Sequence, residues 1–123
     1  MSRFMLAFKV IMGQIENVDT MIFDEIDTGI SGEVSQAVAE KLAHIAKSNQ
    51  VITITHLPTI ASMAKNHYLI SKKVVNNKTI STVVLLDDDG QLAEIARLAG
   101  GKKDSQIALA HATELRNRGK VFL

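Results

Sequence analysis

Residues 20–32 read T-M-I-F-D-E-I-D-T-G-I-S-G, and this stretch decides the fold. An apolar run, residues 21–23, leads directly into two acids, Asp24 and Glu25. This pattern predicts a buried strand whose last residues emerge at the carboxyl edge of a sheet. Ligands of open α/β sheets bind at that edge. We therefore expect any chemistry of this chain to be centred on these carboxylates.

A helix and a second strand follow the first strand. Ser31 can cap a helix over residues 32–48, whose apolar residues recur at helical spacing. Residues 51–55, V-I-T-I-T, form a second, largely β-branched strand. A strand, a helix and a strand in this order predict a βαβ unit with parallel strands and a right-handed crossover.

The remaining pattern predicts an α/β chain of one domain, with an antiparallel hairpin and flanking helices added to the βαβ core. Gly100-Gly101 is expected to stop a helix, and Asp104 or Ser105 to start the last one. A turn is expected at residues 87–90. The expected elements are a helix at 2–13, a short helix at 58–66, hairpin strands at 68–75 and 79–86 joined by 76–78, a helix from about 92 to 99, and a helix to 118.

The expected first helix, residues 2–13, is apolar on nearly all sides. A helix of this kind is normally buried all round, and a chain of 123 residues can hardly cover it. We therefore expect the chain to be a piece of a larger assembly and to form a dimer or a larger species by itself. No apolar stretch approaches the roughly 20 residues of a membrane helix, so no membrane partner is expected. The absence of cysteine agrees with a cytoplasmic location.

Asp24, Glu25 and His56 are the candidate catalytic group. Asp24, at a strand end, suits a Mg²⁺ shell, and Glu25 can accept a proton from an attacking water. His56 ends the second strand, so parallel pairing brings it to the same edge, where an imidazole can contact a phosphate oxygen. The structural alternatives are two solvated acids at a strand end and a histidine that caps the turn before Pro58.

Residues 27–32 form the third candidate element. Gly29 and Gly32 permit a tight, exposed turn. Ser31 is a helix cap in either interpretation, and Asp27 is expected to point across the active edge. By contrast, Gly100-Gly101 with the two lysines that follow lacks the spacing of a phosphate loop, and the three histidines other than His56 show no zinc-ligand spacing.

The motif M-I-F-D-E-I-D-T-G-I-S-G, followed by V-I-T-I-T-H-L-P, closely resembles the C-terminal part of the RecN family of bacterial DNA repair proteins. These are ABC ATPases related to the structural-maintenance-of-chromosomes (SMC) proteins. The resemblance covers nearly the whole chain, including S-R-F-M-L-A-F-K, H-Y-L-I-S-K, E-I-A-R-L-A-G-G and A-L-A-H-A-T-E-L. It implies the C-terminal lobe of an ABC-type P-loop NTPase head.

The resemblance also implies a role for each candidate residue. Asp24 resembles the Walker B aspartate that holds Mg²⁺, Glu25 the glutamate that activates water, and His56 the switch histidine at the γ-phosphate of ATP. The segment that resembles the D-loop, which crosses the interface between two heads, contains Asp27, Ser31 and Gly32.

This chain departs from the family pattern because it has no Walker A loop, no S-G-G of the signature motif and no coiled coil. We therefore expect the chain alone to bind ATP poorly and not to hydrolyse it. The implied partners are the rest of its own head, a second head in a homodimer, and DNA through the intact protein at the nucleoid. Two alternatives remain open: a head segment of another ABC ATPase, from a chromosome-condensing protein or a transporter, and a non-catalytic interaction module.

Overall fold

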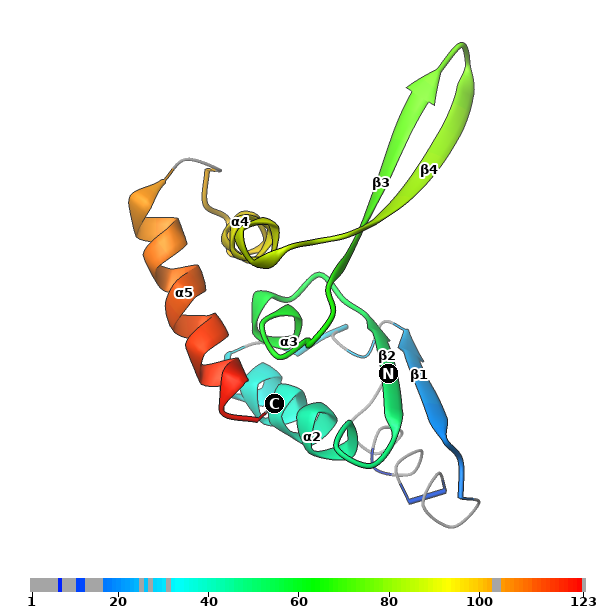
Figure 1. Cartoon of the computed structure of the whole chain (residues 1–123), viewed down its shortest axis with the longest axis vertical. Helices are drawn as coiled ribbons and strands as arrows, with labels where there is room; N and C mark the ends of the chain where they lie inside the picture. Colours follow the sequence, from blue (N-terminus) through cyan, green and yellow to red (C-terminus); the bar gives the residue numbers. More distant parts are fainter. Residues whose placement is uncertain are drawn as a thin grey trace.

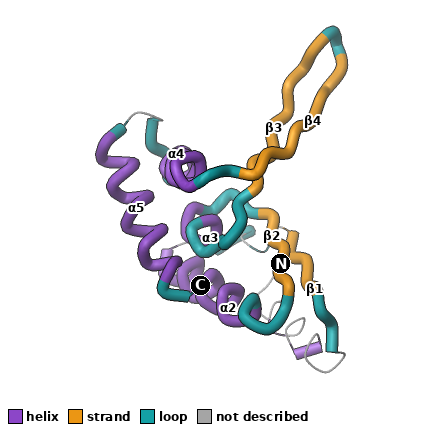
Figure 2. The backbone as a smooth tube through the Cα atoms, viewed as in Figure 1, coloured by secondary structure: helices purple, strands orange, loops and turns teal. Residues whose placement is uncertain are grey.

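The computed structural model describes residues 7, 11–12, 17–24, 26, 28–30, 32–102 and 105–122. The expected helix over residues 2–13 falls almost entirely outside them. Figures 1 and 2 show the chain path and the secondary structure. In chain order the elements are β1 (Thr20–Asp24), α2 (Gly32–Ile45), β2 (Gln50–Ile54), α3 (Pro58–Ala61), β3 (Tyr68–Val75), β4 (Lys78–Leu85), α4 (Asp88–Leu98) and α5 (Gln106–Lys120).

The predicted βαβ unit is confirmed. Strands β1 and β2 pair in parallel, with Met21 opposite Val51 and Asp24 opposite Ile54, and α2 connects them. Side chains alternate along β1, so that Met21 and Phe23 are buried while the residues between and beside them are exposed. The apolar stripe of α2 covers this buried face of β1 (Figure 1).

The described residues form two hydrophobic clusters in the interior, and the short helix α3 contributes to both. Ile60 of α3 belongs to the cluster of β1 and α2, and its neighbour Ala61 belongs to the cluster of α4 and α5. Because adjacent helical residues point in different directions, one turn of helix can join the two clusters. The larger cluster comprises Met21, Phe23, Ile26, Val38, Ala39, Leu42, Ala43, Ile45, Ile60 and Met63. The smaller comprises Ala61, Ile95, Ala96, Ala112 and Leu115.

Helix α5 approaches the end of α3 very closely. A Cβ atom added at Gly119 would lie 2.3 Å from the carbonyl oxygen of Ser62, so only glycine fits there. The guanidinium of Arg116 donates hydrogen bonds to the carbonyl oxygens of Ser62 (2.9 Å) and Ala64 (2.6 Å). These contacts fix the segment after α3 against the last helix.

Strands β3 and β4 form a separate antiparallel hairpin that projects from the body of the molecule (Figure 1). The hairpin was predicted, but its connection is one residue shorter than expected, since β4 begins at Lys78. Asn76 and Asn77 have φ angles of +50° and +59°. Positive φ at both loop positions is the geometry of a two-residue turn that matches strand twist, and asparagine tolerates it.

Helix α4 begins earlier than predicted. The expected turn at residues 87–90 is wrong: Asp87 caps the helix by accepting a hydrogen bond from the backbone N–H of Gly90 at 2.8 Å. Asp88 and Asp89 lie in the first turn, where the helix dipole favours acids. The predicted stop is confirmed by Gly100, whose φ is +84°, and Ser105 caps α5 as expected.

Two other helices are shorter than predicted, since α2 ends at Ile45 and α3 at Ala61. No helix among the described residues is long and apolar enough to span a membrane.

Candidate functional site

The candidate site lies at the carboxyl edge of strands β1 and β2. Asp24 is the last residue of β1, and its side chain is exposed. Asp24 ends β1 and His56 follows β2, so these two residues of the predicted site share one edge of the sheet. Gly32, at the start of α2, is the other described member. Glu25, Asp27 and Ser31 lie outside the described residues.

His56 was predicted to end the second strand, but it lies beyond the end of β2. Strand β2 ends at Ile54, which pairs with Asp24, so His56 lies two residues beyond the register position of Asp24. The backbone turns here, because the N–H of Leu57 donates to Thr55 Oγ1 at 3.0 Å, and Pro58 then begins α3. His56 is exposed on this turn.

The face of the β1–β2 sheet opposite α2 exposes large apolar side chains. Ile22 is 60% exposed, and Ile52 and Ile54 are 45% and 49% exposed. Parallel sheets normally have both faces covered. Asp24 follows Ile22 on this face by strand alternation, so the carboxylate lies beside an apolar surface.

Two glycines of the candidate D-loop adopt left-handed backbone conformations, as the sequence predicted. Gly29 has φ +74° and Gly32 has φ +55°. A Cβ atom at either position would meet nothing within 4 Å, so the requirement for glycine comes from the backbone alone. The backbone of this segment therefore turns before α2 begins.

Asp24 is the described residue that was predicted to bind a metal ion. Among the residues that the structure describes, no group of three or more acidic or histidine side chains could hold a metal ion. A single exposed carboxylate nevertheless suits Mg²⁺, which keeps several waters and binds proteins through one or two carboxylates together with substrate phosphates. The carboxylate of Asp24 therefore fits as one ligand of a Mg²⁺ ion.

Two hydroxyls missed by sequence reasoning connect the segments around this edge. Thr59 Oγ1 donates to Ser35 Oγ at 3.0 Å, and Ser35 Oγ donates to the carbonyl oxygen of Gly32 at 2.7 Å. Ser35 lies three residues before Val38 on the buried side of α2. This spacing was the only sequence signal that Ser35 would be buried. Its partner lies 24 positions away, so the bond itself could not be predicted.

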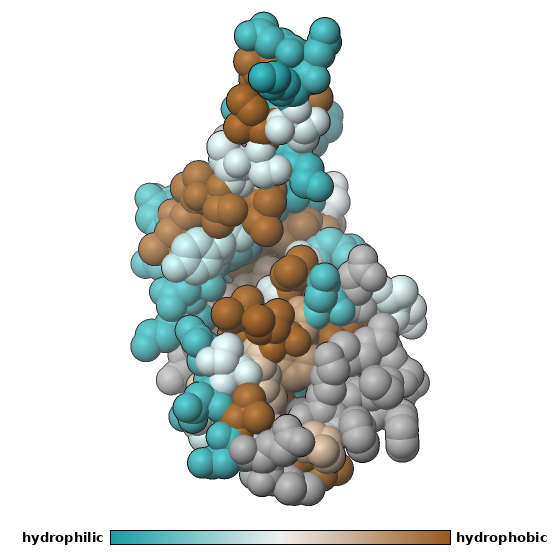
Figure 3. Space-filling model, turned by 90° about the vertical axis from the view of Figure 1, so that its right-hand side faces the viewer, coloured by the Kyte–Doolittle hydropathy of each residue, from teal (hydrophilic) through white to brown (hydrophobic). Residues whose placement is uncertain are grey.

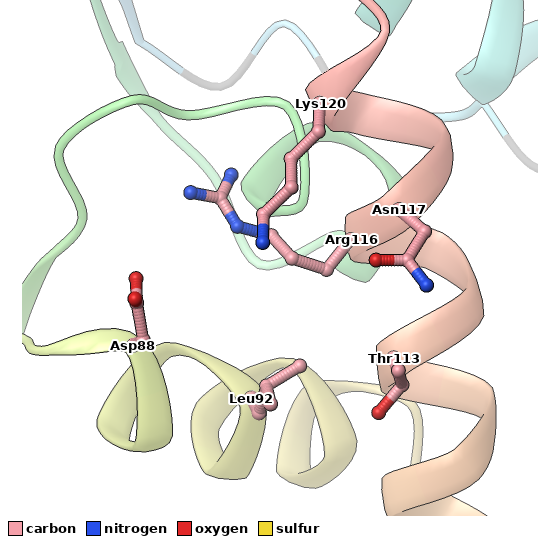
Figure 4. Close-up of a pocket in the computed structure, with 6 residues that line it drawn as sticks. All are labelled: Asp88, Leu92, Thr113, Arg116, Asn117 and Lys120. Atoms are coloured by element: carbon pink, nitrogen blue, oxygen red, sulfur yellow. The ribbon is translucent and has the colours of Figure 1, made fainter.

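A small pocket of about 100 Å³ lies between α4 and α5, away from the carboxyl edge (Figure 4). It is lined by Asp88, Leu92, Thr113, Arg116, Asn117 and Lys120. Arg116 points from α5 toward the segment after α3, where it makes its two hydrogen bonds. Burial lowers the pKa of Arg116 from its ordinary value, against an opposing effect of Asp88. The pocket thus belongs to the helix packing and not to the candidate site.

His67 lies in the same region and shows the same effect of burial. Burial lowers its pKa; Glu94 opposes this shift, and Arg116 reinforces it. Its Nδ1 atom is buried and has no hydrogen-bond partner within the described ranges. The neutral imidazole is therefore the form that suits the fold.

The fold defines the class of the protein. A solved structure from work titled "Structural biochemistry of ATP-driven dimerization and DNA stimulated activation of SMC ATPases" matches 79% of this chain and 57% of its own chain, with a TM-score of 0.62 and 23% sequence identity. The chain therefore has the fold of part of an SMC-like ATPase. No family model matches the sequence.

Curated relatives then show which particular protein this chain resembles. DNA repair protein RecN of Halalkalibacterium halodurans is 46% identical over 114 residues, and that of Bacillus subtilis is 42% identical over 115 residues. RecN of Deinococcus radiodurans is 44% identical over 115 residues. These matches cover 93–94% of this chain but 20% of each relative. The predicted resemblance is confirmed: this is a RecN-like chain, spanning about a fifth of the length of the curated relatives it matches.

Proposed function

We propose that this chain supplies one part of the ATP-hydrolysing site of a RecN-like protein that repairs DNA double-strand breaks. The observation that carries the proposal is the shared edge of the parallel strands β1 and β2, where Asp24 ends the first strand and His56 follows the second, in a RecN-like sequence. Ligands of α/β sheets bind at such an edge. The proposed lobe is the C-terminal part of an ABC-type head.

Three side chains have separate roles in this proposal. Asp24 holds Mg²⁺, which supplies charge neutralisation for the phosphates when it is bound. Glu25 orients the attacking water and takes its proton. His56 donates a hydrogen bond to an oxygen of the γ-phosphate as charge develops there. The exposure of Asp24 and His56 supports these roles because both groups can reach a ligand.

The segment with Asp27, Ser31 and Gly32 is proposed to meet a second head. The positive φ angles of Gly29 and Gly32 support this role, because both glycines are exposed and permit a tight turn. In the intact protein, ATP binding then holds two heads together, and hydrolysis releases them. The structural neighbour, described as an SMC ATPase with ATP-driven dimerisation, supports the same arrangement.

A phosphate cradle must come from residues outside this sequence. The chain contains no G-x-x-x-x-G-K-[ST] motif, and so no Walker A backbone to bind the β- and γ-phosphates. The rest of its own head is therefore the proposed partner that completes the nucleotide site. The chain alone is expected to bind ATP weakly and to leave it unhydrolysed.

Exposed apolar surface supports the need for this partner. Besides the open face of β1–β2, the hairpin exposes apolar residues on both of its faces, with Ile70 and Val83 on one face and Ile80 and Val84 on the other. Figure 3 shows hydrophobic side chains gathered on the hairpin and again below it. Such surfaces mark interaction sites. The isolated chain should therefore be a dimer or larger by light scattering, and a monodisperse monomer would contradict this expectation.

The proposal is tested by mixing the chain with a polypeptide that carries the phosphate-loop part of a RecN head. Hydrolysis of ATP should appear in the mixture and in neither component alone. Asp24→Asn and His56→Ala should each reduce the rate at least tenfold. Asp19→Asn, which changes an exposed acid before β1, and His44→Ala, which changes an exposed histidine of α2, are the matched controls. If the controls lose as much activity as the site variants, the assignment of the edge is wrong.

A further inference from the structure

Two hydrogen bonds in series connect α3, which follows β2, with the first residue of α2, which follows β1. Thr59 donates to the hydroxyl of Ser35, and Ser35 donates to the carbonyl of Gly32. Thr59 of α3 lies three residues beyond His56. Ser35 is 3% exposed, so its donor and its acceptor both need partners within the protein. The bond from Thr59 gives the Ser35 oxygen a donor, and the bond to Gly32 gives the Ser35 hydroxyl hydrogen an acceptor.

The order of donation gives this bridge a direction. A hydroxyl that accepts a hydrogen bond is polarised and donates more strongly, so Thr59 strengthens the bond from Ser35 to Gly32. Gly32 is the first residue of α2, and its φ is +55°. The bridge therefore fixes the orientation of this peptide from the other side of the edge.

We infer that Ser35 and Thr59 are positioning residues that hold the start of α2, at Gly32, in register with the turn that carries His56. This inference rests on the proposed function, because it is the ATPase site that needs the two segments aligned. Neither hydroxyl has to touch nucleotide, since each acts through a backbone or side-chain neighbour. Ser62 Oγ donates to the carbonyl of Thr59 at 2.7 Å, which is a local bond at the end of α3.

Hydrogen exchange of the whole chain tests the bridge itself. Thr59→Val removes the hydroxyl with little change in shape, and it should speed exchange in residues 32–38 about fivefold, the factor for one net hydrogen bond. Ser35→Ala should speed exchange in residues 56–62 to a similar extent. Thr59→Ser keeps the hydroxyl and should restore the original rates. Faster exchange confined to the mutated segment would overturn the inference.

The control and the activity readout separate positioning from general stability. Thr113→Val removes an exposed hydroxyl bond to the carbonyl of Leu109 (2.8 Å) and should leave both segments unchanged. In the active mixture with the phosphate-loop polypeptide, Thr59→Val should lower kcat about fivefold with little change in KM for ATP, and Thr59→Ser should restore it. An unchanged kcat would overturn the positioning role. A wild-type mixture without activity would contradict the proposed function, whereas the exchange data would still decide whether the bridge couples the segments.

Discussion

Arg116 is predicted to stabilise the fold mainly through its hydrogen bonds to the segment after α3. Its side chain is buried, at 8% exposed, and it donates to the carbonyl oxygens of Ser62 and Ala64. Replacement by methionine keeps an unbranched apolar stem but removes all donors. Arg116→Met therefore leaves two carbonyls without their partner while it changes packing little.

The expected magnitude follows from the two bonds. A hydrogen bond to a charged group contributes about 1.5–3 kcal/mol, so two at the lower end give a loss of about 3 kcal/mol. For a urea slope of about 1.5 kcal/mol/M, the unfolding midpoint should fall by about 2 M. Typical stabilities are about 5–15 kcal/mol, so a change of this size is easily measured.

Arg118→Met is the matched control on the same helix. Arg118 pairs with Glu114 at 2.6 Å, but both side chains are about 60% exposed, and such pairs contribute at most about 0.5 kcal/mol. Urea unfolding followed by circular dichroism measures both variants. Equal losses in Arg116→Met and Arg118→Met would refute the assignment of Arg116 to a buried structural role.

Three further changes test other parts of the fold. Gly32→Ala should cost about 1–2 kcal/mol from left-handed backbone strain, and Gly32→Asn less; equal stability of wild type and Gly32→Ala in urea would contradict the observed φ. Gly119→Ala should destabilise by about 1–3 kcal/mol, because the clash with Ser62 outweighs the better helix propensity of alanine; a higher melting temperature would disprove the close approach. Burial in the folded state lowers the pKa of the His67 imidazole. The contribution of neutral His67 to the free energy of unfolding is therefore complete above the unfolded-state pKa of about 6.5, and it is lost as pH falls through the folded-state pKa. Unfolding free energies at pH about 7.5 and about 5.5 should therefore differ less in His67→Gln than in wild type or in the exposed control His111→Gln; parallel pH profiles would exclude His67 as the cause.

The core of the fold was predictable because its signals are local. The apolar run before Asp24, the β-branched run of β2 and the helical stripe between them are periodic patterns, and together they predict a βαβ unit. The error at residues 87–90 is also local in origin. Three successive aspartates are typical of turns, but acids and an aspartate cap equally favour the start of a helix, and apolar packing of Ile95 decides between them.

The candidate site was predictable only in part. Parallel pairing brings Asp24 and His56 to one edge, and this follows from sequence order alone. The bridge from Thr59 through Ser35 depends on how α3 packs against α2, and no residue pattern encodes that packing. The position of α3 between two hydrophobic clusters is likewise a tertiary property, since its four residues carry too little sequence signal.

Glu25 is proposed to be the general base of a shared ATPase site, and replacing it tests that role most directly. The decisive measurement is single-turnover hydrolysis of ATP by the chain mixed with the phosphate-loop polypeptide, with Glu25→Gln compared with wild type. Loss of a general base reduces rates by about 10²–10⁴-fold, and Glu25→Gln should fall in that range while ATP binding by the mixture is retained. Hydrolysis by Glu25→Gln at the wild-type rate would contradict the role of Glu25 as the general base.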